Sequence, residues 1–124
     1  MGAGSRQGEG RLVTRYIPRA GDIVWVNFDP QAGREQAKTR PALVVTDERY
    51  NRASGLAVVC PLTRTRKPYP FSLPCVVGKD EGAVLVDHLR SVDWAARKAS
   101  FHSKAEPDLL TRVRTYIGVL LGVR

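Results

Sequence analysis

The sequence predicts a mainly β domain, a small barrel or rolled sheet, with an α-helix at its C-terminal end. Between residues 21 and 102 the chain consists of short apolar runs separated by turn residues, which is typical of strands with tight connections. After Pro107 the apolar residues recur at spacings of three and four, which indicates an amphipathic helix.

Length and charge limit the kinds of protein this can be. The chain has 124 residues, enough for a single core. It carries 20 lysines and arginines against 12 acidic residues, a net charge of +8. Such an excess favours a polyanionic partner, nucleic acid before an anionic membrane surface. No apolar run is long enough to span a bilayer and no secretory signal is visible, so we expect a cytoplasmic protein without a membrane partner.

A tail and a series of short strands are expected along the chain. Residues 1–13 lack hydrophobic periodicity and should form a flexible basic tail before a single domain over residues 14–124. The first two strands, Ile23–Phe28 and Ala42–Thr46, are apolar on both faces, which indicates burial inside a barrel. The remaining strands are expected at Leu56–Leu62, Phe71–Val77 and Ala83–Leu89, with a short one near Lys98–His102.

The helix is expected to begin near Pro107, which suits the first helical position, and to stop at Gly122. Ser103 and Glu106 resemble a capping box. The apolar face that should pack on the barrel consists of Leu109, Leu110, Val113, Ile117, Leu120 and Leu121.

Further core residues are expected among the cysteines and tryptophans. Cys60 and Cys75 are interpreted as small buried residues rather than a disulfide. Trp25 and Trp94 are interpreted as core residues rather than stacking platforms.

Polar groups at the ends of predicted strands are the candidates for chemistry. No metal-binding or nucleotide-binding motif and no serine nucleophile elbow occurs, so we expect no metal and no cofactor. Glu35 and Arg40 lie in the loop after the first strand, and Thr63 closes the strand before a basic loop that begins with Arg64. Each alone is also explained as a solvated surface group. The pattern by itself supports a basic β domain that binds nucleic acid.

Several ordered motifs give the chain a resemblance to a known family. They are GDIVWVNFDP at residues 21–30, RPALVV at 40–45, CPLT at 60–63, KPYPF at 67–71 and GAVLVDHLRS at 82–91. Over about residues 15–122 the chain resembles the MazF/PemK family of toxin–antitoxin ribonucleases.

The resemblance implies a fold, an activity and partners. The fold is an SH3-like barrel with a C-terminal helix that forms homodimers. The activity is metal-independent cleavage of single-stranded RNA at short sequences, which stops translation and growth until a cognate acidic antitoxin blocks the site. The implied catalytic residues are Arg40, Thr63 and Glu35. The expected RNA-binding residues are Asn27, Phe28, Lys67, His88 and Arg97, to which the basic loop adds Arg64.

These residue types suit attack of a ribose 2′-hydroxyl on its own phosphate, which leaves a 2′,3′-cyclic phosphate and a 5′-hydroxyl. Arg40 and Thr63 would stabilise charge on the phosphoryl oxygens, while Glu35 is a plausible base. Two other function classes stay open. One is a toxin on the same barrel that binds DNA gyrase, and the other is a nucleic-acid-binding module without enzymatic activity.

Overall fold

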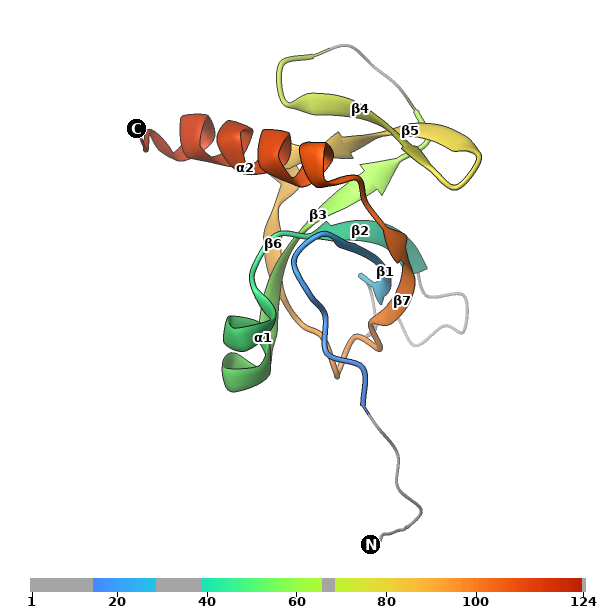
Figure 1. Ribbon diagram of the computed structural model, residues 1–124, viewed down its shortest axis with the longest axis vertical. Helices are drawn as coiled ribbons and strands as arrows, with labels where there is room; N and C mark the ends of the chain where they lie inside the picture. Colours follow the sequence, from blue (N-terminus) through green and yellow to red (C-terminus); the bar gives the residue numbers. More distant parts are fainter. Residues whose placement is uncertain (1–14, 29–38, 66–68, 124) are drawn as a thin grey trace, which may run out of the picture.

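The computed structural model describes residues 15–28, 39–65 and 69–123 (Figure 1). Its strands are β1 (Asp22–Asn27), β2 (Thr39–Val44), β3 (Leu56–Thr63), β4 (Ser72–Val77), β5 (Asp80–Leu85), β6 (Arg90–Asp93) and β7 (Ser100–Lys104). Its helices are α1 (Glu48–Ser54), α2 (Pro107–Leu121) and a 3₁₀ helix, η2 (Val86–His88). Within these ranges no helix is long and apolar enough to cross a membrane.

All strands belong to one antiparallel sheet in the order β4-β5-β3-β2-β1-β7, with β6 paired to the first half of β3. Strand β3 is shared between two parts of this sheet, because residues 56–59 pair with β6 and residues 59–61 pair with β2, while Leu62 and Thr63 pair with β5. The sheet curls into a half-barrel, and α2 lies across it (Figure 1). The predicted fold class, mainly β in a small barrel with a C-terminal helix, is confirmed.

The central strands are buried on both faces, as predicted. Side chains of successive strand residues point to opposite faces, so each strand contributes to two clusters. One cluster lies between the sheet and α2 and includes Ile23, Leu43, Cys60, Leu109 and Val113. The other fills the half-barrel and includes Val24, Val26, Ala42, Val44, Val59, Val92 and Trp94.

Helix α1 was not predicted, and it supplies the main polar anchor of the core. Asn51 in α1 is fully buried. Its Nδ2 donates hydrogen bonds to the carbonyls of Pro18 (2.8 Å) and Thr46 (3.0 Å), and its Oδ1 accepts one from the Thr46 hydroxyl (2.6 Å). The Trp94 indole donates to the Asn51 carbonyl (2.9 Å). Through its side-chain amide and its backbone carbonyl, Asn51 thus joins four segments of the chain, and these hydrogen bonds offset the desolvation of the buried amide.

Helix α2 begins and ends close to the predicted positions, but its cap differs. Pro107 occupies the first turn and Gly122 takes the left-handed conformation at the C-cap (φ 75°), as expected. The capping box is wrong, because Glu106 is itself the N-cap residue and no side chain caps the helix. The last predicted apolar positions, Leu120 and Leu121, are exposed in this single chain (37% and 65%).

Several boundaries also differ from the sequence prediction. The strand expected at Ala83–Leu89 ends at Leu85, since the chain turns into η2, where the Val86 amide donates to the Phe71 carbonyl (2.9 Å). The short strand β6 was not predicted. The expected tail over residues 1–13 lies outside the described residues, and the single-domain boundaries stay a prediction.

The two cysteines should differ in reactivity. Both are free thiols, but Cys60 is buried as predicted, whereas Cys75 is only half-buried. Burial, helped by the nearby Asp87 carboxylate, raises the pKa of Cys60 to about 12. The folded state therefore favours the Cys60 thiol, and this contribution to stability is lost as the pH rises above the unfolded value of about 8.5.

We expect iodoacetamide at about pH 8 to label Cys75 of the native protein well before Cys60, because only the thiolate reacts. Mass spectrometry of tryptic peptides measures both rates. Labelling in urea is the control, where the two cysteines should react alike. Equal rates in the native protein would contradict the burial of Cys60.

Candidate active site

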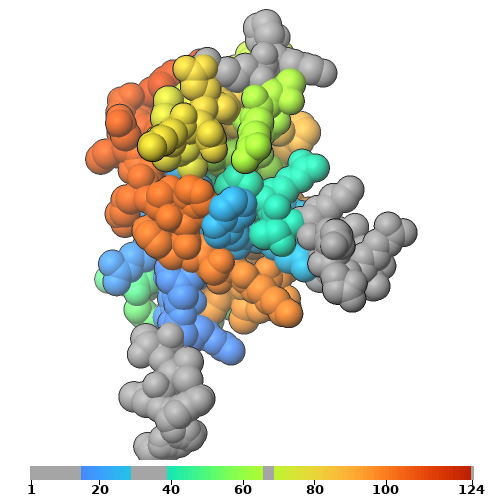
Figure 2. All heavy atoms as spheres, turned by 90° about the vertical axis from the view of Figure 1, so that its right-hand side faces the viewer, coloured from blue at the N-terminus to red at the C-terminus, as the bar shows by residue number. Residues whose placement is uncertain are grey.

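The predicted catalytic residues Arg40 and Thr63 line the same hollow, whose volume is about 440 Å³. Figure 2 faces this side of the molecule, where β1 (blue), the start of β2 (teal), the end of β3 (green), β5 (yellow) and β7 (orange) come together. The hollow thus lies where both parts of the sheet meet. The antiparallel pairing of β2 with β3 brings together these two side chains, which are separated in sequence.

The β1–β2 pairing positions Arg40. In the antiparallel register Arg40 lies opposite Val26, and Thr39 lies opposite Asn27. The two strands flank the predicted loop, but the placement of Arg40 in that loop is wrong, because β2 begins at Thr39 and Arg40 pairs within it. The Arg40 side chain is exposed rather than buried in the sheet, so its guanidinium is accessible to a ligand. Glu35, the predicted base in that loop, lies outside the described residues.

A close approach of two strands positions Thr63. Thr63 is the last residue of β3 and lies opposite Ala83 of β5. A side chain at the neighbouring Gly82 would place its Cβ 2.4 Å from the Thr63 carbonyl oxygen, so only glycine permits this approach. The Thr63 Oγ1 accepts a hydrogen bond from the Thr65 amide (3.1 Å), which leaves the hydroxyl proton available for donation.

Trp25 and His102 also line this hollow, and sequence reasoning missed both. Trp25 was expected in the core, but 38% of its surface is exposed. Its ring centroid lies 4.8 Å from that of His102, with 55° between the planes. In a run as apolar as Ile23–Val26, the period of the strand does not reveal which position faces an opening.

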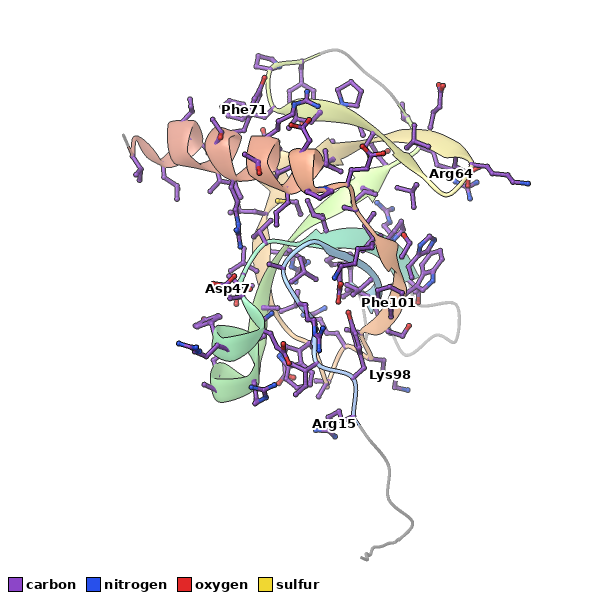
Figure 3. The ribbon with its side chains drawn as sticks, viewed as in Figure 1. Arg15, Asp47, Arg64, Phe71, Lys98 and Phe101 are labelled. Carbon is purple, nitrogen blue, oxygen red and sulfur yellow. The ribbon has the colours of Figure 1, made fainter. Side chains whose placement is uncertain are left out.

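Charges of both signs surround the hollow. Arg40 and Arg64 lie on its β2 and β3 walls, while Asp80 and Glu81 come from the start of β5. Figure 3 shows Arg64 at the end of β3, beside the β4–β5 hairpin. The arginines suit phosphate oxygens, and the carboxylates can accept hydrogen bonds from amino groups.

Three of the predicted RNA-binding residues meet at the end of β1. Arg97 donates from Nη1 to the backbone carbonyl of Asn27 (3.2 Å), and the backbone amide of Asn27 donates to the backbone carbonyl of Arg97 (3.1 Å). Phe28 follows, with the Arg90 guanidinium carbon 5.3 Å from its ring centroid. Arg97 is held in the β6–β7 turn, where Lys98 takes a left-handed conformation (φ 55°; labelled in Figure 3).

His88, another predicted RNA-binding residue, lines a second hollow of about 250 Å³. Thr63 and Thr65 line both hollows, which therefore adjoin at the end of β3. Tyr69 lines the second one and donates to Asp87 Oδ1 (2.8 Å); burial and this hydrogen bond raise the pKa of its hydroxyl. Lys67 lies outside the described residues. In the part of the chain that is described, no His, Cys, Asp or Glu side chains group to hold a metal.

Residues 19–121 match the model of a family described as PemK-like, MazF-like toxin of type II toxin–antitoxin system. The chain belongs to this family. The endoribonuclease toxin MazF of Escherichia coli K12 is 38% identical over 111 residues, which cover 90% of this chain and 100% of that protein. The endoribonuclease toxin ChpB of the same organism is 41% identical over 85 residues, covering 64% of this chain and 72% of the relative.

Solved structures of this family have the same fold. MazF of Deinococcus radiodurans is 48% identical with a TM-score of 0.76, covering 88% of this chain and 100% of that one. MazF in a MazE–MazF complex of the same organism is 46% identical with a TM-score of 0.77 and the same coverage. The prediction of an endoribonuclease toxin of the MazF/PemK family is confirmed, and the gyrase-binding and non-enzymatic alternatives lose support.

The close approach at Gly82 leads to a prediction. We expect Gly82→Ala to lower the free energy of unfolding by about 1–3 kcal/mol, because the new Cβ meets backbone that cannot swing away. Displacement of β5 from Thr63 should also slow RNA cleavage. Urea denaturation and a cleavage assay measure the two effects.

Gly118→Ala is the matched control. Its Cβ would meet nothing closer than 3.8 Å, and in the last turn of α2 an alanine should stabilise by up to about 0.5–1 kcal/mol. If Gly82→Ala matched this control in both measurements, the proposed role of the close approach would be wrong.

Proposed function

We propose that this protein cuts single-stranded RNA, including mRNA, at a short recognition sequence, with the ribose 2′-hydroxyl as nucleophile and without a metal ion. The observation that carries the proposal is the common hollow lined by Arg40 and Thr63. A planar guanidinium and a hydroxyl on separate strands can contact different oxygens of one phosphate. The family relationship adds support, since relatives are named endoribonucleases.

In the proposed reaction, phosphorus exchanges one bond to oxygen for another. The 2′-oxygen bonds to phosphorus and the bond to the 5′-oxygen breaks, which gives a 2′,3′-cyclic phosphate and a 5′-hydroxyl. Arg40 and Thr63 stabilise the charge that builds on the phosphoryl oxygens. We assign Glu35 as the base that takes the proton of the 2′-hydroxyl, because an arginine is a poor base. Arg40 is assigned as the donor of the proton that the 5′-oxygen gains.

The RNA is proposed to run along the two adjoining hollows. Phosphates would contact Arg64 and Lys67, and His88 lines the second hollow. Asn27, Phe28 and Arg97 lie together at the end of β1, where they are proposed to bind a further part of the RNA. These contacts fit the net charge of +8, which attracts a polyanion.

A cognate acidic antitoxin is proposed to bind the same surface and block it. The support is the similarity of this chain to MazF in MazE–MazF complexes of D. radiodurans, together with its basic charge. Release from this antitoxin would stop translation in the cytoplasm and arrest growth.

The protein is proposed to form a homodimer. The end of α2 and the residues after it expose Val119, Leu121 and Val123 by 64–65% each. Exposed apolar side chains at the end of a helix are typical of a surface that a second protein copy covers.

Cleavage should persist in EDTA and depend on Arg40. With a long RNA, we expect the wild type to cut at defined sites that primer extension maps. Arg40→Ala should cut about 10²–10³ times more slowly, since one stabilising contact to the phosphoryl group is lost. The control is Arg49→Ala, which removes an exposed positive charge from α1.

Three results would refute this function. They are undiminished cutting by Arg40→Ala, a requirement for magnesium, and cutting of an RNA that has deoxyribose at the cut position. Salt-sensitive binding without any product would support the non-enzymatic module, and intact RNA with gyrase trapped on DNA would support the gyrase poison.

The dimer can be tested separately. We expect Leu121→Glu to reduce the mass in solution from twice 13.7 kDa towards 13.7 kDa, because a charge would be buried between the copies. Light scattering after gel filtration measures the mass. Thr111→Glu, at an exposed position on the same helix, should leave the mass unchanged. A wild type that is monomeric at all concentrations would contradict the proposal.

A further inference from the structure

We propose that Trp25, with the His102 ring packed against it, forms an aromatic platform, and that one nucleobase of the RNA stacks on Trp25 beside the cleaved phosphate. The platform is defined by these two side chains, and it rests on the proposed function of the hollow. It would be a base-binding subsite that neither motif nor charge pattern revealed.

The two tryptophans of the chain differ in a way that points to a ligand. Only 7% of the surface of Trp94 is exposed, and its indole N–H donates a hydrogen bond to the Asn51 backbone carbonyl. Trp25 instead exposes 38% of its surface in the hollow that Arg40 and Thr63 line. A large aromatic ring left open in a concave site gains contact area when a flat apolar ligand covers it.

A β-bulge brings His102 to this platform. Ser103 pairs with Ile23 and Phe101 pairs with Val24, so His102 is an extra residue in β7 without a partner on β1. Bulges of this kind redirect side chains and occur near active sites. The His102 Nδ1 is also hydrogen bonded to the Ser103 hydroxyl (2.8 Å), which orients the ring beside Trp25.

The platform is rigid and close to the proposed chemistry. Trp25 lies in β1 between two paired strands, opposite Pro41 of β2 and Ser100 of β7. Pro41 follows Arg40 directly, so the stacked base should belong to a nucleotide next to the cut. Because backbone pairing already fixes β1, stacking orders little of the protein.

Hydrogen-bonding groups beside the platform suit the edge of a nucleobase. Asp80 and Glu81 line the same hollow. The same carboxylates can accept hydrogen bonds from the amino groups at the edge of a base. Single-stranded RNA also presents a flat face at each nucleotide, and stacking on aromatic side chains is its common mode of recognition.

A double-mutant cycle between protein and RNA tests the platform. The ligand is an RNA that spans a mapped cut site, with deoxyribose at the cut position to prevent cleavage, and each nucleotide is replaced in turn by an abasic one. In the wild type, one position next to the cut should lose about five- to 150-fold in affinity.

For Trp25→Ala we expect intact RNA to bind correspondingly more weakly, with no further loss from the abasic substitution at that position. His102→Ala should show a smaller loss at the same position, and His102→Phe should restore the affinity. Trp25→Phe retains a ring and serves as the check on folding, together with thermal denaturation of each variant.

Three outcomes would overturn the platform. In the first, the abasic loss is the same in the wild type and in both alanine variants. In the second, the alanine variants weaken binding equally at every abasic position. In the third, Trp25→Ala weakens binding of an acidic antitoxin peptide and leaves RNA binding unchanged. If the wild type cuts RNA in EDTA but the side-chain and abasic substitutions show no coupling, only the platform is refuted. If the wild type does not cut RNA, the proposed function is refuted.

Discussion

The structure depends on the close approach of β5 to the end of β3, which is possible because Gly82 has no side chain. Strand β3 then pairs with β6 in its first half, with β2 in its middle and with β5 at its end. Through this sharing, Thr63 and Arg64 at the end of β3 line the hollow together with Asp80 and Glu81 of the neighbouring β5. A wider separation of β3 and β5 would open the hollow and move the two carboxylates away from Thr63.

Polar anchors hold the opposite end of β2. Arg114 of α2 donates two hydrogen bonds to the Val45 carbonyl (2.7 and 3.1 Å) and pairs with Asp47, just after β2 ends. The buried amide of Asn51 fixes Thr46 next to them. Since the anchors are at one end of the strand and Arg40 is at the other, the exposed guanidinium can meet a ligand without weakening the core.

Much of the fold could be predicted because the signals were local. Apolar runs between turn residues gave the strands, and the change in spacing after Pro107 gave α2. Helix α1 was missed because Glu48–Ser54 is polar and is held by the long-range bonds of Asn51, which no local pattern encodes. Strand β6 is short and exists through its pairing with β3.

The site was predictable in part for the same reason. Motif positions gave Arg40 and Thr63, which do line one hollow. The exposure of Trp25 and the position of His102 depend on a bulge between strands far apart in sequence, so they needed the fold. That pairing also constrains when the protein can become toxic. A ribosome must synthesise every residue up to β7 before β1 finds its second partner, so until then the nascent chain has no complete hollow with which to attack RNA.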